Sequence, residues 1–374
     1  LDHSILLYKL DYYGVKDEAY NLLESYISNR RQFVAFGDVC SDEIIIKTGV
    51  PQGSILGPLL FLIYMNDIYF STDKLDFLLY ADDTTISSTI KSINNMNDSD
   101  STNINSELAK ITDWLKLNRL SLNVDKTKCM IFHNYQKKVE APNSMLDNKP
   151  VDVVDSFNFL GITLDKHLNF KCHVDKIATK ISRTVGVINR LKHFLPSDVL
   201  LTLYNSLVLP HLYYGVLIWG TNTKRISILQ KRAVRTMSVS KYNAHTAPIF
   251  KKHKLLTLDD IHKVQCLKFY YKYINRSLPS KLQSLTIQQN SSLHNFNTRQ
   301  ASDLHIPHNK TQIGRRSVLH SLPLIVNSLP KIVSEKVHTH SLHGFSVYVK
   351  NYLISLYKEN CEIHNCYICQ KHNT

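Results

Sequence analysis

The stretch Phe77-Leu78-Leu79-Tyr80-Ala81-Asp82-Asp83-Thr84-Thr85-Ile86 decides how the front of this chain folds. Two short apolar runs flank a pair of acidic residues, which predicts a β-hairpin that carries the acids at its turn. Carboxylates on rigid strands are ligands that Mg²⁺ prefers. Adjacent acids also occur in turns for solvation alone, so this string does not by itself decide between a metal site and an ordinary turn.

A second string, Gly49-Val50-Pro51-Gln52-Gly53-Ser54, precedes the hairpin and is rich in turn-forming residues. The glycines have no side chain, so a base pair or a nucleotide can pack closely against the backbone. Gln52 adds an amide that can contact the backbone or a base. The alternative is an ordinary Gly/Pro turn before the apolar run Ile55–Ile68, which we expect to be a buried helix.

Together the two strings suggest the synthesis of phosphodiester bonds. That reaction needs a 3′ hydroxyl made nucleophilic and a leaving pyrophosphate that is stabilised, and two Mg²⁺ ions about 3.5–4 Å apart can do both. We expect Asp82 to be the principal ligand at the hairpin tip and Asp83 to matter less for direct ligation.

The charge balance favours a polyanionic partner. The 374 residues include 45 Lys and Arg against 31 Asp and Glu, a formal net charge of +14. RNA or DNA is the obvious partner, and an anionic membrane surface is the alternative. The longest apolar run is too short to span a bilayer, so we expect no membrane insertion. The seven scattered Cys indicate a reducing, intracellular compartment without a disulfide framework.

The rear half has a helical period. Apolar residues recur every three or four positions from Val174 to Leu191, which predicts a long helix with one buried seam. Basic side chains fall between them and are candidates for contacts with nucleic-acid phosphates: Lys176, Lys180, Arg183 and Arg190. A solvated basic face is the alternative interpretation.

The end of the chain is rich in Cys and His. Residues Cys361, His364, Cys366 and Cys369 are of types that bind zinc, although their spacing is compressed. Unpaired tail thiols are the alternative, and a measurement of bound zinc decides between them.

The ordered strings resemble LINE-type (non-LTR retrotransposon) reverse transcriptases. The segment Gly49–Phe61 resembles motif B, Leu78–Thr84 resembles motif C, and Trp114–Phe132 resembles motif D. The segment Phe159–Asp165 is similar to the primer-grip region that follows. Farther on, the thumb-like segment Leu203–Gly220 and the string Asn327-Ser328-Leu329-Pro330 extend the resemblance over nearly the whole chain.

The resemblance implies a role for each matching residue. Asp82 and Asp83 would hold two Mg²⁺ ions, with Mn²⁺ as a substitute, and Lys126 would lie near the triphosphate as a catalytic residue. The residues implied to border the nascent base pair, the nucleotide and the primer end are Gln52, Gly53, Ser54, Tyr80 and Ala81.

The resemblance also implies the reaction and its partners. They are an RNA template, a DNA primer or target, and dNTPs, with the protein in the nucleus or cytoplasm as a ribonucleoprotein. We therefore expect an RNA-directed DNA polymerase. Zn²⁺ at the tail would help to bind RNA.

One part of the family pattern is not in this sequence. Motif A, with its metal-binding Asp, would precede Leu1, and Asp2 resembles a later Asp of that stretch. We expect residues 1–374 alone not to polymerise, which a magnesium-dependent primer-extension assay tests. A catalytically dead nucleic-acid-binding remnant is the alternative, and the upstream genomic frame separates the two. A group II intron-type maturase is a weaker third interpretation, against which the tail after Asn327 argues.

The expected fold class is α+β, with a partial right-hand polymerase palm (an antiparallel sheet with helices) followed by a mostly α-helical thumb and C-terminal region. The expected domains are 1–165 for the palm, 166–285 for the helical thumb or connection, and 286–374 for the C-terminal region with its Cys/His tail. Within the first of these, 91–106 is expected to be a surface loop and 128–133 a strand.

Overall fold

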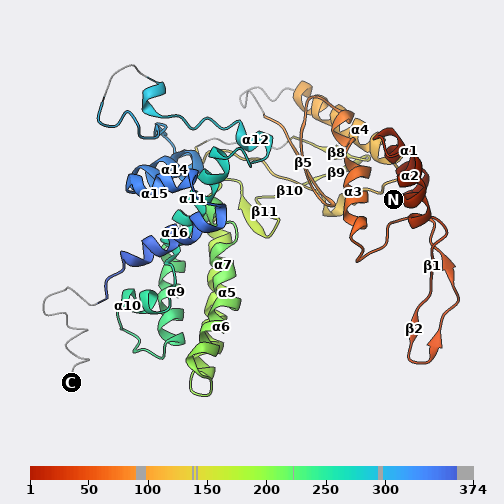
Figure 1. Cartoon of the computed structure of the whole chain (residues 1–374). Coiled ribbons are helices and arrows are strands. Elements are labelled where there is room, and N and C mark those ends of the chain that lie inside the picture. Colours follow the sequence, from red (N-terminus) through yellow and green to blue (C-terminus); the bar gives the residue numbers. More distant parts are fainter. Residues whose placement is uncertain (90–97, 137–138, 140–141, 222, 294–297, 360–374) are drawn as a thin grey trace. The chain divides into compact units, whose positions relative to one another are not determined.

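A computed structural model describes residues 1–89, 98–136, 139, 142–221, 223–293 and 298–359 (Figure 1). The chain divides into two compact units, Leu1–Asp155 (unit 1) and Ser156–Thr374 (unit 2). Unit 1 mixes helices with short strands, and unit 2 is helical apart from one hairpin. The α+β class is therefore confirmed.

Unit 1 is built from four α-helices and several short strands. Its helices are α1 (His3–Tyr12), α2 (Asp17–Ile27), α3 (Leu56–Met65) and α4 (Asp98–Leu117), with 3₁₀ turns η1 (Ile68–Ser71) and η2 (Val124–Lys126). Its strands are β1 (Arg31–Gln32), β2 (Ala35–Phe36), β3 (Val39–Cys40), β4 (Ile44–Ile45), β5 (Asp76–Tyr80), β6 (Asp83–Ser87), β7 (Lys128–Cys129), β8 (Met145–Leu146), β9 (Lys149–Pro150) and β10 (Asp152–Val153).

The strands of unit 1 join only in pairs within the described residues. Strands β5 and β6 are antiparallel, with Tyr80 opposite Asp83, and β7 pairs with β10 in parallel. Pairs β1–β4 and β2–β3 form a ribbon that extends away from α1 and α2 (Figure 1). The wider antiparallel sheet that was expected is not formed by these strands.

Unit 1 has two small apolar cores. One joins α1, α2 and α3 around Leu6, Leu10 and Tyr64, and the other joins α3, η1, α4 and the β5–β6 hairpin around Met65 and Ile111. A buried ammonium links the helices, because Lys9 Nζ donates to the Tyr64 carbonyl and to Asp67 Oδ1, both at 2.6 Å. Polar contacts therefore supplement modest apolar packing in unit 1.

Three predictions for unit 1 need correction. The surface loop expected over 91–106 is wrong from Asp98 onward, where α4 begins; its Asn, Ser and Asp residues fill the first turns, as is common at helix N-termini. The buried helix is α3, but it is buried on one side only, since Leu59 is 51% and Leu62 is 49% exposed. The strand expected over 128–133 is limited to β7.

The described residues of unit 2 form one hairpin, twelve α-helices and two 3₁₀ turns, η3 (Asn290–Ser292) and η4 (Lys336–His338). The hairpin is β11 (Ser156–Phe159) and β12 (Ile162–Asp165). The helices are α5 (Lys171–Leu191), α6 (Ser197–Leu207), α7 (Leu209–Tyr213), α8 (Val216–Trp219), α9 (Lys224–Met237), α10 (Ala247–Lys252), α11 (Leu258–Ile274), α12 (Ser280–Gln283), α13 (Gln312–Arg316), α14 (Val318–Asn327), α15 (Lys331–Glu335) and α16 (Leu342–Ser355).

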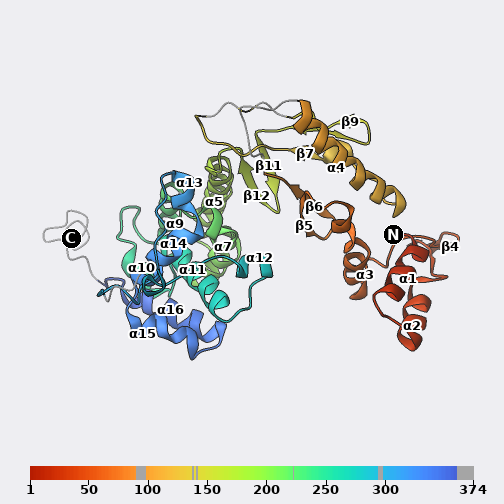
Figure 2. The ribbon, with the colours of Figure 1, turned by 90° about the horizontal axis from the view of Figure 1, so that it is seen from above.

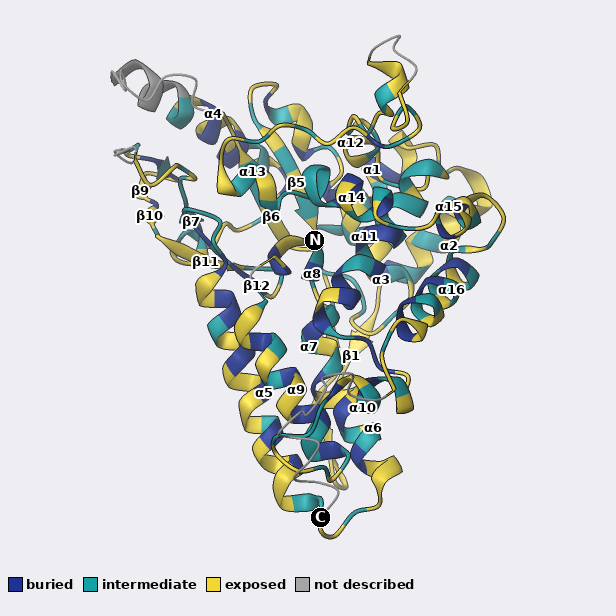
Figure 3. Cartoon of the chain, turned by 90° about the vertical axis from the view of Figure 1, so that its left-hand side faces the viewer, coloured by how far each residue is buried: buried dark blue, intermediate teal, exposed yellow. Residues whose placement is uncertain are grey.

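One large core runs through unit 2. It extends from Ile162 on β12 to Ile354 on α16 and includes the fully buried side chains of Tyr204 and Trp219. The predicted seam on α5 is confirmed, since its apolar positions are buried while the positions between them are exposed (Figure 3). Helices α5 and α9 pack side by side in this core.

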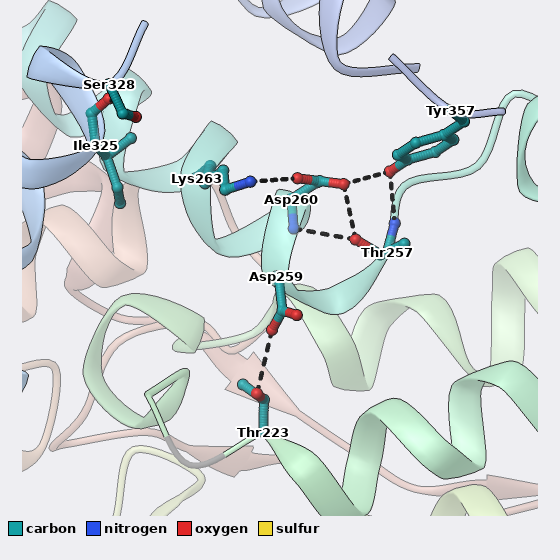
Figure 4. Close-up of polar contacts among 8 residues, drawn as sticks. All are labelled: Thr223, Thr257, Asp259, Asp260, Lys263, Ile325, Ser328 and Tyr357. Carbon is teal, nitrogen blue, oxygen red and sulfur yellow. Dashed lines mark hydrogen bonds and ion pairs between the residues drawn. The ribbon is translucent and has the colours of Figure 1, made fainter. Parts of the chain in front are cut away.

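A polar network fixes the start of α11. Thr257 caps the helix by accepting from the Asp260 N–H, and the Tyr357 hydroxyl donates to Asp260 Oδ2 and accepts from the Thr257 N–H (Figure 4). Lys263 Nζ lies 2.8 Å from Asp260 Oδ1. Burial and the neighbouring Asp260 raise the pKa of Tyr357. This network holds the end of the described chain against α11.

The boundary between the units lies before β11. The β11–β12 turn packs on helices of unit 2: Gly161, at φ +81°, leaves only 3.3 Å between an added Cβ and the Tyr214 ring, and the Tyr214 hydroxyl donates to the Leu160 carbonyl. The expected palm included this hairpin up to residue 165, whereas the compact unit ends at Asp155. The functional division into three domains stays a prediction.

Candidate active site and basic groove

The acidic pair occupies the tip of the β5–β6 hairpin, as predicted. Two residues, Ala81 and Asp82, connect the strands, and Asp83 begins β6. Residues paired across a hairpin share a face, so Asp83 and Tyr80 lie on the same side. That side is open, because Tyr80 is 64% exposed, whereas Phe77 on the other side packs into the core.

Ala81 adopts a left-handed conformation, with φ +51°. A residue with a Cβ is disfavoured there by roughly 1–2 kcal/mol. Here the turn is held by the ladder of five residue pairs beneath it.

The donor set at the tip fits a hard divalent cation. Asp82 and Asp83 are both exposed, and neither forms an ion pair with another described residue. Oxygen ligands of this type are what Mg²⁺ requires. In the described part of the chain, no group of three or more His, Cys, Asp or Glu is placed to hold a metal.

The loop before α3 is tied to the N-terminus of the chain. The Gly49 N–H donates to the Leu1 carbonyl at 2.6 Å, and His3 Nε2 donates to the Gly49 carbonyl at 2.8 Å. Gly49 has φ +90°, a conformation that glycine adopts without strain. Gln52 and Gly53, the residues expected to border the base pair, are exposed at the end of this loop.

Ser54 has an internal role in the loop. Its hydroxyl donates to the Pro51 carbonyl at 2.7 Å and accepts from the Gly57 N–H at 3.0 Å. Both contacts tie the loop to the first turn of α3. The structure therefore gives Ser54 a positioning role, and its predicted contact with substrate stays a prediction.

Lys126 lies at the end of η2. Its N–H donates to Asn123 Oδ1 at 3.1 Å, which orients this turn, and its side chain is exposed. Val124 of the same turn packs into the core that also holds Met65 of α3 and Leu79 of β5. The β5–β6 hairpin, α3 and η2 thus share one small core. Within the described residues, no contact joins Lys126 to Asp82 or Asp83.

The predicted basic stripe lies on the exposed side of α5. The residues Lys176, Lys180, Arg183 and Arg190 follow one another by four, three and seven positions, which places them on one side of the helix. Lys176 Nζ donates to Thr163 Oγ1 on β12 at 3.0 Å. Lys180 and Arg183 form no ion pair with a described residue.

Helices α5 and α7 lie near the β11–β12 hairpin (Figure 2), and the stripe borders a hollow of about 790 Å³ that these elements line. Lys176, Lys180 and Arg183 line it from α5, and His211 lines it from α7. Arg190, the fourth residue of the stripe, does not. The structure thus divides a set of residues that looked equivalent in the sequence.

The pKa values of two histidines in the hollow are lowered. Burial, followed by the charges of Lys176 and Lys180, lowers the pKa of His173. Burial, followed by the charge of Lys180, also lowers the pKa of His211. His173 Nδ1 accepts from the Thr163 N–H at 3.3 Å, so Nε2 carries the ring proton, and it has no hydrogen-bond acceptor in the described chain.

Sequence reasoning missed the residues that shape these sites from a distance. His211 lies in the thumb-like segment but was not singled out, and His3 and Arg225 have no motif around them. The fold brings His3 to the loop and His211 to the hollow, and Arg225 of α9 pairs with Asp175 in the lining of the hollow. The Cys and His residues predicted to bind zinc, from Cys361 onward, lie outside the described residues.

Comparisons with known proteins support the resemblance. Residues 1–164 match the family described as "Reverse transcriptase (RNA-dependent DNA polymerase)". The resemblance to LINE-type reverse transcriptases is confirmed. The part of the chain that matches this reverse transcriptase family contains the Gly49 loop, the acidic hairpin and Lys126.

The curated relatives are polymerases of mobile elements. The chain is 31% identical over 273 residues to the probable RNA-directed DNA polymerase from transposon BS of Drosophila melanogaster, a match of 68% of this chain and 28% of the relative. It is 28% identical to those of transposon X-element (65% of this chain, 28% of the relative) and mobile element jockey (69% and 29%) of the same species. The chain thus spans less than a third of the length of these relatives.

Proposed function

We propose that this chain is part of an RNA-directed DNA polymerase of a non-LTR retrotransposon, one that extends a DNA 3′ end along an RNA template. The observation that carries this proposal is the exposed acidic tip on a rigid hairpin inside the segment that matches reverse transcriptases. The helical part from Ser156 onward would be the thumb, and the front part a partial palm. The protein would act inside the cell as a ribonucleoprotein.

Asp82 and Asp83 would hold Mg²⁺ at this tip. Bound there, the metal would supply charge stabilisation for the attacking and leaving oxygens of nucleotidyl transfer. Tyr80, on the same face as Asp83, would flank the primer end. The exposed backbone of Gly53 and the amide of Gln52 would border the new base pair, and Lys126 would lie near the triphosphate.

Asp82 and Asp83 have no cationic partner among the described residues, which suits them to bind a metal ion. Because neither acid is neutralised by a described cation, both remain available as metal ligands. The polar contacts of Ser54 and His3 keep the loop in place without occupying Gln52. The site therefore combines a fixed backbone with unoccupied ligand atoms.

Iron-mediated cleavage tests the metal site directly. Fe²⁺ bound in place of Mg²⁺ generates radicals in the presence of ascorbate and peroxide, and these cut the backbone nearby. We expect cutting within residues 78–86 of the full chain, suppressed by excess Mg²⁺ and lost in Asp82→Asn. The fragments are mapped by mass spectrometry.

Asp76→Asn is the matched control, because Asp76 is also an exposed acid on β5 but lies at the opposite end of the hairpin. This variant should be cut like the unmodified chain. Equal loss of cutting in the two variants, or cutting elsewhere only, would remove the metal assignment from the tip.

A further inference from the structure

The Gly49 loop is held by the two neighbours of Asp2. The Leu1 carbonyl accepts from the Gly49 N–H at 2.6 Å, and His3 Nε2 donates to the Gly49 carbonyl at 2.8 Å. Asp2 itself forms an antiparallel bridge with Thr48, the residue before the loop. The position of Asp2 therefore decides where the loop begins.

Asp2 is fixed by groups from distant parts of unit 1. Its Oδ2 accepts from the Arg119 guanidinium at 2.5 Å, while its Oδ1 caps the first turn of α1. The Asp2 N–H donates to the Tyr64 hydroxyl at 3.4 Å, and that hydroxyl donates to the Asn118 carbonyl at 2.6 Å. Both links lead to the end of α4, which lies close to the N-terminus of the chain (Figure 2).

Asp2 and Arg119 differ in their exposure to solvent. The side chain of Asp2 is 13% exposed, whereas that of Arg119 is 69% exposed. A carboxylate that has lost most of its water needs polar or charged partners. Arg119 supplies a charge-assisted bond from the solvent side, so its removal should leave Asp2 less firmly held.

Arg119 occupies a backbone position that favours glycine. It follows α4 at φ +50°, its N–H donates to the Lys116 carbonyl, and the next N–H, of Leu120, donates to the Leu115 carbonyl. Arg276 follows α11 in the same arrangement, at φ +52°. Arg276 is exposed and forms no ion pair with a described residue. The two arginines thus share a backbone setting, but only Arg119 is bound to a carboxylate.

We propose that Arg119 is a positioning residue for the Gly49 loop, which it holds through the carboxylate of Asp2. The inference rests on the proposed function for what the loop borders, namely a new base pair beside Gln52 and Gly53. It goes beyond that function because Arg119 forms no hydrogen bond with the loop in the described chain and acts at a distance. A loop whose first residue is pinned presents its exposed groups in one geometry.

Amide exchange of the loop is the test, measured by mass spectrometry on the full chain without nucleotide or metal. Arg119→Ala should speed exchange in residues 47–53 about fivefold, the upper range for an ion pair with one exposed partner. Arg119→Lys keeps the charge and should restore most of the protection. Lys116→Ala is the matched control, since it also removes a paired, exposed cation from the end of α4, and it should leave the loop unchanged.

Glycine at the helix end separates the side chain from the backbone. Arg119→Gly removes the guanidinium but places the favoured residue at this position, so α4 should stay folded. The loop should loosen as in Arg119→Ala. Arg276→Gly makes the same backbone change at the end of α11 and should leave the loop unchanged. Thermal unfolding should show that neither glycine variant is less stable than the unmodified chain.

A double-mutant cycle shows whether Asp2 carries the effect. Asp2→Asn keeps an oxygen that can cap α1 but loses the charge, and it should loosen the loop about as much as Arg119→Ala. The combined variant should be no looser than either single variant, because both changes break the same link.

Two outcomes would overturn the proposal. Additive losses in the cycle would show that Arg119 does not act through Asp2. An equal rise of exchange in the loop and throughout α1, α3 and α4 would show a general loss of stability instead of positioning. Iron cleavage reports separately on the proposed function: its failure beside a responsive loop removes the metal assignment alone, and an unresponsive loop beside normal cleavage removes only the role of Arg119.

Discussion

The two units of this chain differ in how they bury apolar surface. In the described residues, unit 2 has one large core that runs from β12 to α16, whereas unit 1 has two small cores and strands that join only in pairs. Unit 1 compensates with buried polar links, such as Lys9 with Asp67 and Glu107 with Thr72. The comparison indicates that packing stabilises unit 2, while unit 1 depends more on a few charged contacts.

Truncation of the core tryptophan should give the largest effect. Trp219→Ala removes a fully buried ring whose Nε1 donates to the Tyr214 carbonyl at 2.8 Å, and should cost about 3–5 kcal/mol of unfolding free energy. Hydrogen exchange measured by mass spectrometry should rise throughout unit 2 but not in unit 1. Ile218→Ala changes the half-exposed neighbouring residue and should alter stability little. An equal rise of hydrogen exchange in both units would show that loss of the unit 2 core also opens unit 1.

Loss of the buried ammonium should destabilise unit 1 by a smaller amount. Lys9→Ala leaves Asp67 and the Tyr64 carbonyl without their donor, at a cost of about 2–3 kcal/mol, reduced because Asp67 is partly exposed. Chemical denaturation followed by hydrogen exchange in α1 and α3 measures it. Lys9→Met keeps the apolar stem of the side chain and should lose less unfolding free energy than Lys9→Ala. If both variants are as stable as the unmodified chain, the polar link contributes nothing to stability.

The two units should respond to acid in different pH ranges. Burial lowers the pKa of four histidines in unit 2, which are His173, His211, His253 and His262. The unfolded chain therefore binds more protons than the folded chain as the solution becomes acidic, and unit 2 should lose stability as pH falls below about 6.5. In unit 1, a hydrogen bond from Ser4 lowers the pKa of Asp2 to about 2, and a hydrogen bond from Thr72 lowers the pKa of Glu107 to about 2. Unit 1 should therefore weaken only between about pH 4.5 and 2.

Hydrogen exchange across a pH series, corrected for intrinsic rates, separates these windows. Loss of protection in unit 1 before unit 2 on acidification would contradict the assignment.

The smallest effect should come from Ile55, the residue just before α3. Ile55→Ser changes a residue that is 95% exposed and should shift the unfolding free energy by less than about 0.5 kcal/mol. Leu60→Ser, on the buried side of α3, should cost about 3 kcal/mol. Thermal unfolding checks both, and equal effects would show that the start of α3 packs against the core, contrary to the exposure of Ile55.

Local pattern was enough to predict the hairpin and the long basic helix. The acids between β5 and β6 and the apolar seam of α5 both follow from the alternation of residues along a single element. The roles of motif residues such as Asp82 and Lys126 came from the resemblance, and they stay predictions.

Features that depend on contacts distant in sequence could not be predicted. The start of α4 was missed for a different, local reason: polar residues are typical both of loops and of first helical turns, and the run before Leu108 belongs to the helix from Asp98 onward. Nothing in the sequence separates Arg183 from Arg190, since the difference between them is set by α7, α9 and the β11–β12 hairpin. The link from His3 to Gly49 is likewise visible only in the fold.

The paired strands of unit 1 have a consequence for handling the protein in solution. A two-stranded ladder offers hydrogen-bonding groups along both outer edges, and the ribbon formed by the β1–β4 and β2–β3 pairs adds exposed Phe36, Val39 and Ile44. At high concentration, we expect such edges to template strand addition between molecules. Dilute, cool storage and a lysine introduced on the ribbon, for example at Val39, should keep preparations monodisperse.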